Sequence, residues 1–401
     1  MPNKKIKDGL YSVGILNPNM RVFDIVMKTE WGTSYNSYIV KAEKTALIET
    51  CHHRFFKEYS QNISEVTDPD GIDYIILNHT EPDHSGALER LVKLCRHAEI
   101  VCSRAASIYL KAITNDPERA FKVVKDGDTL SLGSIDLKFV SAPFLHWPDT
   151  MFTYAPQLKT VFTCDFLGAH FCEPNMIDSD ISYPEKYKSA LKGYYDDIFS
   201  PFTRYVRDGL VKLKGLDFDT VCVSHGPILT NKTFLGYALK SYAEWSAEQP
   251  KTTLNLPVFY CSAYGYTRKL ADAAVEEIKA AFKDADTAAY DIIENDVDAL
   301  ADILNESDGF MIGSPTLNRD AVRPVWELLA RLDAINSQKK PAAVFGSYGW
   351  SGEAVSAVTA RLNAVNIRTT GDGFKINFNP SAAELLEMKK FTASFLDNFK
   401  K

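Results

Sequence analysis

The sequence lacks the motifs of several common sites. Its seven cysteines form no Cys-x-x-Cys pair, so it encodes neither a zinc knuckle nor a rubredoxin-type iron site. It also contains neither a glycine-rich dinucleotide motif nor the lysine of a Walker loop. No apolar run approaches the length that a membrane-spanning helix needs, so we expect none.

Clusters of basic charge and an export signal are missing as well. The 45 Lys and Arg residues stand against 52 Asp and Glu residues, a net charge of −7, without a long basic run. This pattern argues against nucleic acid as the main ligand. Residues 1–8 contain no apolar signal segment, and most cysteines fall in apolar segments where a buried, reduced thiol is expected. We therefore expect a cytoplasmic protein.

The length of 401 residues predicts two or three domains. A polar, proline-containing segment near residues 248–253 separates two different patterns, so we place domains at residues 1–250 and 251–401. In the first, runs of strands are followed by helices, which indicates mixed sheets covered by helices. In the second, strands and helices alternate strictly, which indicates a doubly wound parallel sheet. The predicted fold class is therefore α+β followed by α/β.

Hydrophobic periodicity predicts the individual elements. In the first domain we expect strands at residues 37–40, 45–49, 74–77, 99–102, 121–124, 134–140, 151–154, 160–164 and 220–224, and helices at 53–63, 105–113, 186–199 and 202–214. In the second we expect strands at residues 256–260, 287–290, 309–312 and 342–345, and helices at 267–282, 298–305, 321–332, 352–364 and from 381.

One short segment carries four side chains that can bind metal. It reads His79-Thr80-Glu81-Pro82-Asp83-His84 and lies on a loop between the strand at residues 74–77 and a helical pattern at residues 85–94. Loops anchored at both ends are a common place for catalytic groups. The spacing directs side chains to both faces of the backbone, which suits two neighbouring metal ions better than one. Alternatively, the four residues only decorate a polar loop.

Three further ligand-type residues follow other predicted strands. His146 comes shortly after the strand at residues 134–140, Asp165 directly after the strand at 160–164, and His225 directly after the strand at 220–224. These strand ends could supply the remaining ligands of a two-metal site.

The seven residues resemble, in type, order and spacing, the ligands of the metallo-β-lactamase superfamily, and more closely those of the flavodiiron proteins within it. The set is His79, Glu81, Asp83, His84, His146, Asp165 and His225. The hydrolases of the superfamily commonly carry a second histidine where this chain has Glu81. A hard carboxylate at that position favours iron over zinc.

This resemblance implies an αββα sandwich with a diiron centre. One iron would be held by His79, Glu81 and His146, and the other by Asp83, His84 and His225. Asp165 would bridge them. Some members of the family do not use the residue matching His84 as a direct ligand, so its role stays open. His170 and Tyr195 resemble positions that orient ligands or deliver protons, although core packing would explain either residue equally well.

The second domain carries three polar loops at the carboxyl ends of its strands, where a parallel sheet binds its ligand. They resemble the flavin mononucleotide (FMN) site of flavodoxins. The first opens onto a helix, whose N-terminus can cradle a phosphate without a cationic partner. The loops comprise Ser262, Ala263, Tyr264, Gly265, Tyr266 and Thr267; Ser314, Pro315, Thr316, Leu317, Asn318 and Arg319; and Ser347, Tyr348, Gly349, Trp350, Ser351 and Gly352.

Together the two resemblances imply an oxidoreductase that reduces dioxygen to water, or nitric oxide to nitrous oxide, at the same diiron site. The electrons would come through FMN from an external donor: a rubredoxin, a reduced deazaflavin or a flavin reductase. A head-to-tail homodimer, alone or as a dimer of dimers, would bring the FMN of one subunit to the iron of the other. Two other classes remain open at this stage, a metal-dependent hydrolase and a pure electron carrier.

Overall fold

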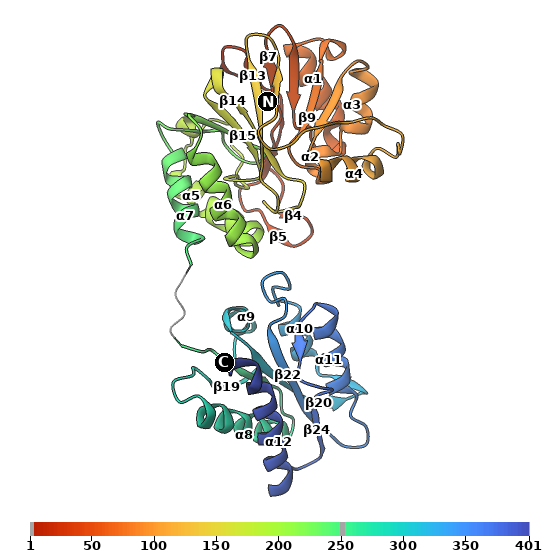
Figure 1. Ribbon diagram of the computed structural model, residues 1–401, viewed down its shortest axis with the longest axis vertical. Helices are drawn as coiled ribbons and strands as arrows, with labels where there is room; N and C mark the ends of the chain where they lie inside the picture. The colour runs from red at the N-terminus through yellow and green to blue at the C-terminus, as the bar shows by residue number, and fades with distance from the viewer. Residues whose placement is uncertain (1–3, 249–252, 401) are drawn as a thin grey trace. The chain divides into compact units, whose positions relative to one another are not determined.

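The computed structural model describes residues 4–248 and 253–400 (Figure 1). The residues on either side of this gap form two compact units. The predicted domain boundary, between residues 250 and 251, lies outside the described residues. No helix of the described chain has the length and apolar character needed to cross a membrane.

The first unit contains two mixed sheets. In spatial order, the first consists of β1 (Lys4–Lys7), β2 (Leu10–Ser12), β7 (Tyr38–Lys41), β8 (Thr45–Ile48), β9 (Tyr74–Leu77), β10 (Glu99–Cys102) and β11 (Lys122–Val123). The second consists of β12 (Thr129–Ser131), β13 (Asp136–Ser141), β14 (Met151–Ala155), β15 (Thr160–Cys164), β16 (Thr220–Val223) and β17 (Leu229–Thr230). The unit also has two small two-stranded sheets. One pairs β3 (Ile15–Asn17) with β6 (Thr33–Tyr35), and the other pairs β4 (Val22–Phe23) with β5 (Met27–Lys28).

Alternating side chains explain how the first sheet packs. Along β9, Tyr74 and Ile76 belong to the apolar layer between the two sheets, whereas Ile75 and Leu77 belong to the layer on the other face. This alternation is the two-residue period of a strand. The outer layer is covered by α1 (Phe56–Val66), α3 (Leu88–Leu94) and α4 (Arg104–Ile113). A sheet buried on both faces explains why β9 has an unbroken apolar sequence.

The second sheet is covered in the same way on its own outer face. There Phe152, Val161 and Val221 pack with residues of α5 (Pro184–Tyr194), α6 (Thr203–Lys214) and α7 (Leu235–Trp245). Figure 1 shows these three helices on the opposite side of the sandwich from α1, α3 and α4. The layers are therefore helix, sheet, sheet and helix, which confirms the predicted αββα sandwich.

Hydrogen bonds join the two sheets at the strand ends that carry the ligand-type residues. The Met151 amide donates to the Asn78 carbonyl at 2.9 Å, directly beside His79. The Tyr38 hydroxyl donates to the Val223 carbonyl at 2.6 Å, two residues before His225. These contacts bring segments that are distant in sequence to one edge of the sandwich.

The second unit is a doubly wound parallel sheet, as predicted. Its strand order is β19 (Ala289–Asp291), β18 (Val258–Tyr260), β20 (Phe310–Leu317), β22 (Pro341–Tyr348) and β23 (Arg368–Thr369), with β24 (Phe374–Asn377) also paired to β22. The cores of the two faces are separate. α8 (Tyr266–Ala281) and α12 (Ala382–Leu396) cover one face. α9 (Val297–Glu306), α10 (Arg323–Leu329) and α11 (Glu353–Ala364) cover the other.

Two strands of this sheet run further than predicted. Residues 314–317 were expected in a loop but extend β20, because β21 (Asp320–Ala321) folds back and pairs with its end. β22 likewise continues to Tyr348, where β24 pairs with it. β24 was not predicted at all. The polar residues of the expected loops therefore sit partly on strand ends.

Candidate metal centre and flavin pocket

The four ligand-type residues that follow β9 are held by a tight turn. We predicted a loop, but Asp83 and His84 lie in a four-residue helical turn, α2 (Pro82–Ser85), with proline at its start. A side chain at Gly86 would meet the Pro82 carbonyl oxygen at 2.3 Å, so the turn requires glycine there. Glu81 precedes the turn. The turn separates the four side chains into two groups.

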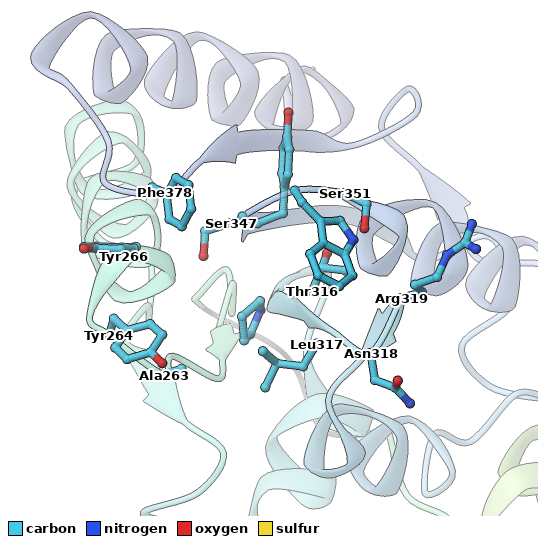
Figure 2. A pocket seen from close by; sticks show the side chains of 14 residues that line it. Ala263, Tyr264, Tyr266, Thr316, Leu317, Asn318, Arg319, Ser347, Ser351 and Phe378 are labelled. Atoms are coloured by element: carbon cyan, nitrogen blue, oxygen red, sulfur yellow. The ribbon is translucent and has the colours of Figure 1, made fainter.

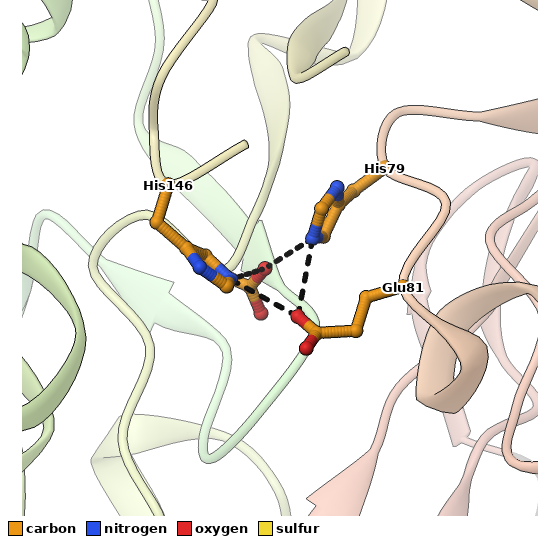
Figure 3. Close-up of side chains that lie close together, drawn as sticks. His79, Glu81 and His146 are labelled. Carbon is orange, nitrogen blue, oxygen red and sulfur yellow. Dashed lines mark hydrogen bonds and ion pairs between the residues drawn. The ribbon is translucent and has the colours of Figure 1, made fainter. Parts of the chain in front are cut away.

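The first group gathers around Glu81. Its Oε2 atom lies 3.3 Å from His79 Nε2 and 3.1 Å from His146 Nε2. Figure 3 shows His79 and Glu81, from one segment, converging with His146 from another. His79 is fully buried, and Glu81 is partly buried. Two imidazole nitrogens and a carboxylate oxygen thus point to one place.

The second group gathers around Asp83. Its Oδ2 atom lies 2.9 Å from His225 Nε2, and its Oδ1 atom lies 3.4 Å from His84 Nε2. All three side chains are buried. Again two imidazole nitrogens converge on one carboxylate.

Asp165 lies between the two groups. Its Oδ2 atom faces the first group, at 3.7 Å from His79 Nε2 and 3.6 Å from His146 Nε2. Its Oδ1 atom faces the second, at 3.1 Å from His84 Nε2 and 3.5 Å from His225 Nε2. One carboxylate oxygen for each group is the arrangement of an aspartate that bridges two metal ions. The structure therefore brings all seven predicted ligands together.

Several histidines of the centre have a hydrogen-bond partner on the ring nitrogen that faces away from it. His79 Nδ1 lies 3.2 Å from Asp149 Oδ2, which also accepts hydrogen bonds from the amide and the hydroxyl of Thr80 at 2.8 Å. His225 Nδ1 donates to the Ser34 carbonyl at 2.6 Å. Such partners fix the tautomer that leaves Nε2 free for a metal. Sequence reasoning missed Asp149, although it lies only three residues after His146.

The unsatisfied atoms and charges of the site fit bound metal ions. Apart from the nearby rings of His225 and His84, both buried carboxylate oxygens of Asp83 lack a hydrogen-bond partner among the described residues. Although burial opposes it, hydrogen bonds from His146 and His79 hold the pKa of Glu81 well below its ordinary value. Against the effect of burial, a hydrogen bond with Asp149 raises the pKa of His79 well above its ordinary value. In the metal-free chain, an added proton on the His79 ring thus supplies positive charge that a cation would otherwise provide.

The two predicted auxiliary residues differ in position. His170 lies beside the centre: its Nδ1 is 2.9 Å from Thr33 Oγ1, and its ring centroid is 5.3 Å from that of His225. Tyr195 points elsewhere, with its ring 5.1 Å from those of Tyr242 and Trp245. Its buried hydroxyl has no hydrogen-bond partner in the described chain.

The hydroxyl that reaches the centre belongs to the preceding residue. Tyr194 donates to Asp165 Oδ1 at 3.0 Å. Consecutive residues of a helix point about 100° apart, so when Tyr194 faces the centre, Tyr195 turns into the helix layer. Burial, reinforced by the charge of Asp165, raises the pKa of Tyr194 well above its ordinary value. The structure thus places the hydroxyl of Tyr194, and not that of the predicted Tyr195, against Asp165, a difference that sequence spacing alone could not show.

The flavodoxin-like unit has a cavity of about 320 Å³ at the carboxyl ends of β18, β20 and β22. Residues of all three predicted loops line it, and Figure 2 shows Tyr264, Tyr266 and Phe378 on one side with Leu317 opposite. Trp350 also lines it and is 90% exposed, as a residue that covers a bound planar ring would be. The remaining predicted lining residues are Ala263, Pro315, Thr316, Asn318, Ser347, Tyr348, Gly349 and Ser351, together with Arg319.

Five of the predicted residues do not line the cavity but belong to the segments around it: Ser262, Gly265, Thr267, Ser314 and Gly352. Thr267 Oγ1 and Ser347 Oγ are 2.8 Å apart, and Ser262 Oγ accepts from the Arg268 amide at 3.4 Å. Ser314 Oγ accepts from the Val322 amide at 3.1 Å. The other two are glycines: Gly265, at a φ of +79° before α8, and Gly352, where a Cβ would lie 2.9 Å from the Tyr348 ring.

Phe378 is a lining residue that the sequence reasoning missed. It follows β24, the strand that was not predicted, so its position at the carboxyl end of the sheet went unnoticed. The signal that could have found it is the strand-like segment Phe374–Asn377, because each strand of a parallel sheet brings the residues that follow it to the ligand-binding edge.

Metal binding to this centre should release protons. Because interactions with nearby carboxylates raise the pKa values of His79 and His84 despite burial, both rings carry extra protons in the metal-free chain and must lose them to bind a metal. We expect affinity for ferrous iron to rise with pH, with about one proton or more released per ion. Calorimetric titration in buffers of different ionisation enthalpy measures this, and equal heats would contradict it. His97→Gln, at an exposed histidine, should behave like the unaltered chain.

Models of two protein families match the chain. Residues 33–226 match the model described as ODP family beta lactamase, and residues 258–391 match the flavodoxin model. The two matches fall on the two compact units, on the αββα sandwich and the doubly wound sheet respectively.

The chain is similar along most of its length to several known proteins. The flavo-diiron protein FprA2 of Clostridium acetobutylicum is 50% identical over 396 residues, covering 98% of this chain and 99% of that protein. The anaerobic nitric oxide reductase flavorubredoxin of Pectobacterium atrosepticum is 32% identical, covering 91% of this chain and 72% of that protein. The solved rubredoxin oxygen:oxidoreductase of Desulfovibrio gigas aligns with a TM-score of 0.68 at 26% identity, covering 99% and 98%. By this similarity along its whole length, the chain belongs to the flavodiiron proteins, a family of oxidoreductases that combine a diiron centre with FMN.

Proposed function

We propose that this chain reduces dioxygen to water at two iron ions, with electrons supplied through FMN. The geometry of Asp165 supports this most directly, because its two carboxylate oxygens face two separate groups of ligands. A carboxylate shared in this way suits a pair of metal ions that act on one small molecule. Glu81 adds a hard oxygen ligand, which favours iron over zinc and argues against a hydrolase.

The residue assignment follows the two groups. His79, Glu81 and His146 would hold one iron, and Asp83, His84 and His225 the other, with Asp165 between them. Iron bound by these residues would supply a binding site for the gas and electrons for its reduction. The reaction takes up four electrons and four protons for each dioxygen and forms two waters.

Side chains of this unit would orient the ligands and manage protons. Asp149 and the Ser34 carbonyl hold the rings of His79 and His225 in the tautomer that faces the metals. The Tyr194 hydroxyl donates to Asp165 and can shift toward a proton acceptor in the site. His170 is buried, and its Nε2 atom has no hydrogen-bond partner among the described residues, so it is available to a ligand or a water molecule.

The cavity of the second unit would hold FMN. The N-terminus of α8, which follows Gly265, suits the phosphate, since free amide groups and the helix dipole attract an anion. Tyr264 and Trp350 are largely exposed aromatic residues at the cavity and would cover the ring. FMN exchanges electrons singly or in pairs, so it can link a donor to the metal centre.

Reduction of nitric oxide is the second candidate reaction. It joins two nitric oxide molecules with two electrons and two protons to form nitrous oxide and water. The similarity to a flavorubredoxin named for nitric oxide reduction supports it, just as the similarity to a rubredoxin oxygen:oxidoreductase supports reduction of dioxygen. Both reactions would use the same seven ligands, so the ligand set alone does not separate them.

We further propose an external electron donor, with a rubredoxin first and a reduced deazaflavin or flavin reductase as alternatives. The metal ligands lie in one unit and the flavin cavity in the other. A head-to-tail homodimer, alone or within a dimer of dimers, would place the FMN of one subunit at the iron pair of its partner. Seven unpaired cysteines fit a reducing compartment, so we place the protein in the cytoplasm.

Rapid mixing of the fully reduced protein with each gas tests the reaction. We expect dioxygen to reoxidise the iron and FMN rapidly and to yield water without hydrogen peroxide. Faster reoxidation by nitric oxide, with nitrous oxide as product, would reverse the order of the two candidates. Asp83→Ala is the control: it should abolish gas reduction, because it removes the carboxylate shared by His84 and His225, and it should leave flavin reduction intact.

Two adjacent tyrosines provide a matched pair of variants. Tyr194→Phe removes the hydrogen bond to Asp165 and should slow gas consumption roughly tenfold or more. Tyr195→Phe removes a buried hydroxyl without a described partner and should leave the rate within about twofold. Steady-state rates at equal iron and FMN content measure both. If Tyr195→Phe slowed gas consumption and Tyr194→Phe did not, the role would belong to Tyr195, as the sequence predicted.

Dilution tests the proposed dimer. If electrons pass between subunits, dissociation into monomers should abolish turnover while both cofactors stay bound. Turnover is measured across a series of protein concentrations, and the mass distribution at each concentration gives the fraction of dimer. A fully active monomer would exclude transfer between subunits.

A further inference from the structure

The outer helix layer of the first unit contains a cavity that the proposed reaction does not use. It has a volume of about 520 Å³ and lies between α6 and α7, which pack side by side (Figure 1). Neither the metal ligands nor the residues of the flavin cavity line it. Sites for small molecules commonly have volumes of this order. The cavity is therefore large enough for a ligand of its own.

Small residues at and just after the end of α7 leave this space open. Leu210 and Lys214 of α6 are four residues apart, so they project from the same face of the helix toward the cavity. Ala243 on α7 and Ala247 just after it line the cavity from the other helix. Protein interiors are normally close-packed, and two alanines cannot fill the gap between two helices. Larger residues at these positions would have closed it.

The walls of the cavity are mainly aliphatic and only half-buried. Leu210, Leu216, Phe218 and Leu239 pack against the outer apolar layer of the second sheet and also line the cavity. Val211, at the rim, is 67% exposed. A ligand that covers these side chains would remove apolar surface from water, which favours binding. Phe218 is the single aromatic residue of the described lining, so the walls suit a flexible alkyl chain better than a planar ring.

The charged residues of the lining are both basic. They are Arg207 and Lys214, and no acidic residue of the described chain lines the cavity. The whole chain has a net charge of −7, so this local excess of positive charge runs against its composition. The Arg207 guanidinium donates to the carboxylate of Glu248, whose side chain is 80% exposed and lies outside the lining. Charge complementarity therefore favours an anionic ligand.

A buried hydroxyl adds a specific polar group to the cavity. Ser246 lines it and is fully buried, and its Oγ atom has no hydrogen-bond partner among the described residues. Buried polar atoms are normally hydrogen-bonded, because an unpaired one costs stability. Arg207 lies directly beside this residue, since its guanidinium donates to the Ser246 carbonyl at 2.6 Å. The two side chains together offer donors for the oxygen atoms of an anion next to the apolar walls.

We propose that this cavity binds a straight-chain carboxylate of the fatty-acid class. The carboxylate accepts hydrogen bonds from the Ser246 hydroxyl and from the Arg207 guanidinium, where it replaces the exposed Glu248. The alkyl chain lies against the leucines of α6 and α7, and the apolar stem of Lys214 covers it while the ammonium stays in water. These residues belong to neither the metal centre nor the flavin cavity, so the inference is independent of the proposed reaction.

Calorimetric titration of the iron- and FMN-loaded protein with straight-chain carboxylates, below their micelle-forming concentrations, tests the proposal. We expect affinity to rise roughly threefold to fourfold with each added methylene from hexanoate to decanoate. Decanol has the same chain without the charge and should bind at least roughly tenfold more weakly than decanoate. Equal affinity for the two compounds, or no measurable binding of decanoate, would overturn the proposal. This comparison needs no substitution.

Substitutions at the polar end locate the site. Ser246→Ala removes the buried hydroxyl and should weaken decanoate binding roughly fivefold. Arg207→Gln removes the charge and should weaken it roughly tenfold or more. Arg204→Gln is the matched control, because Arg204 is an exposed arginine of α6 outside the lining, and it should leave the affinity unchanged. If neither Ser246→Ala nor Arg207→Gln weakened binding, the assignment of the carboxylate would be wrong.

A substitution that fills the cavity distinguishes other occupants. Ala243 is exposed, so Ala243→Phe places a ring in the cavity without disturbing the buried core. We expect it to abolish decanoate binding while iron and FMN stay bound. The mass distribution of this variant should equal that of the unaltered chain. If a dimer or larger assembly were lost instead, the cavity would be an interface between copies of the chain, and the proposal would fail.

Discussion

The Asp165 carboxylate is the constraint on which the metal centre depends. Its two oxygens face different histidine pairs, so its position sets the separation of the two ligand groups. It is 1% exposed and follows β15, whose position depends on the apolar layer between the two sheets. The packing of the sandwich thereby determines the geometry of the site, although no single strand carries enough ligands to bind even one metal ion.

So many buried ionisable groups are tolerated because they neutralise one another. A buried charge is costly unless it is paired and hydrogen-bonded, and here each carboxylate faces imidazoles. Bound cations would replace the protons of the metal-free chain without leaving charges uncompensated. Asp149 and the Ser34 carbonyl add hydrogen bonds around the centre, at the Nδ1 atoms of His79 and His225.

The two units use the ends of their strands in different ways to build a site. In the sandwich, ligands from both sheets must converge, and hydrogen bonds such as Met151 to Asn78 join the sheets at the site. In the parallel sheet, every strand delivers its following residues to the same edge, so the cavity forms from the segments that follow the neighbouring strands β18, β20 and β22. Most residues of the flavin cavity could therefore be predicted from the alternation of strands and helices. Phe378 was missed because it follows β24, a strand that was not predicted.

The fold class and the types and order of the candidate ligands could be read from the sequence. The spacing of His79, Glu81 and Asp83 beside an apolar strand indicates a metal site, and alternation of strands and helices predicts the second sheet. Which side chains meet depends on how the elements pack. Tyr194 rather than Tyr195 reaches Asp165, because helical phase at a packed surface separates neighbours that look equivalent in sequence. Asp149 had no motif to reveal it, since its nearness to His79 arises only when the two sheets pack together.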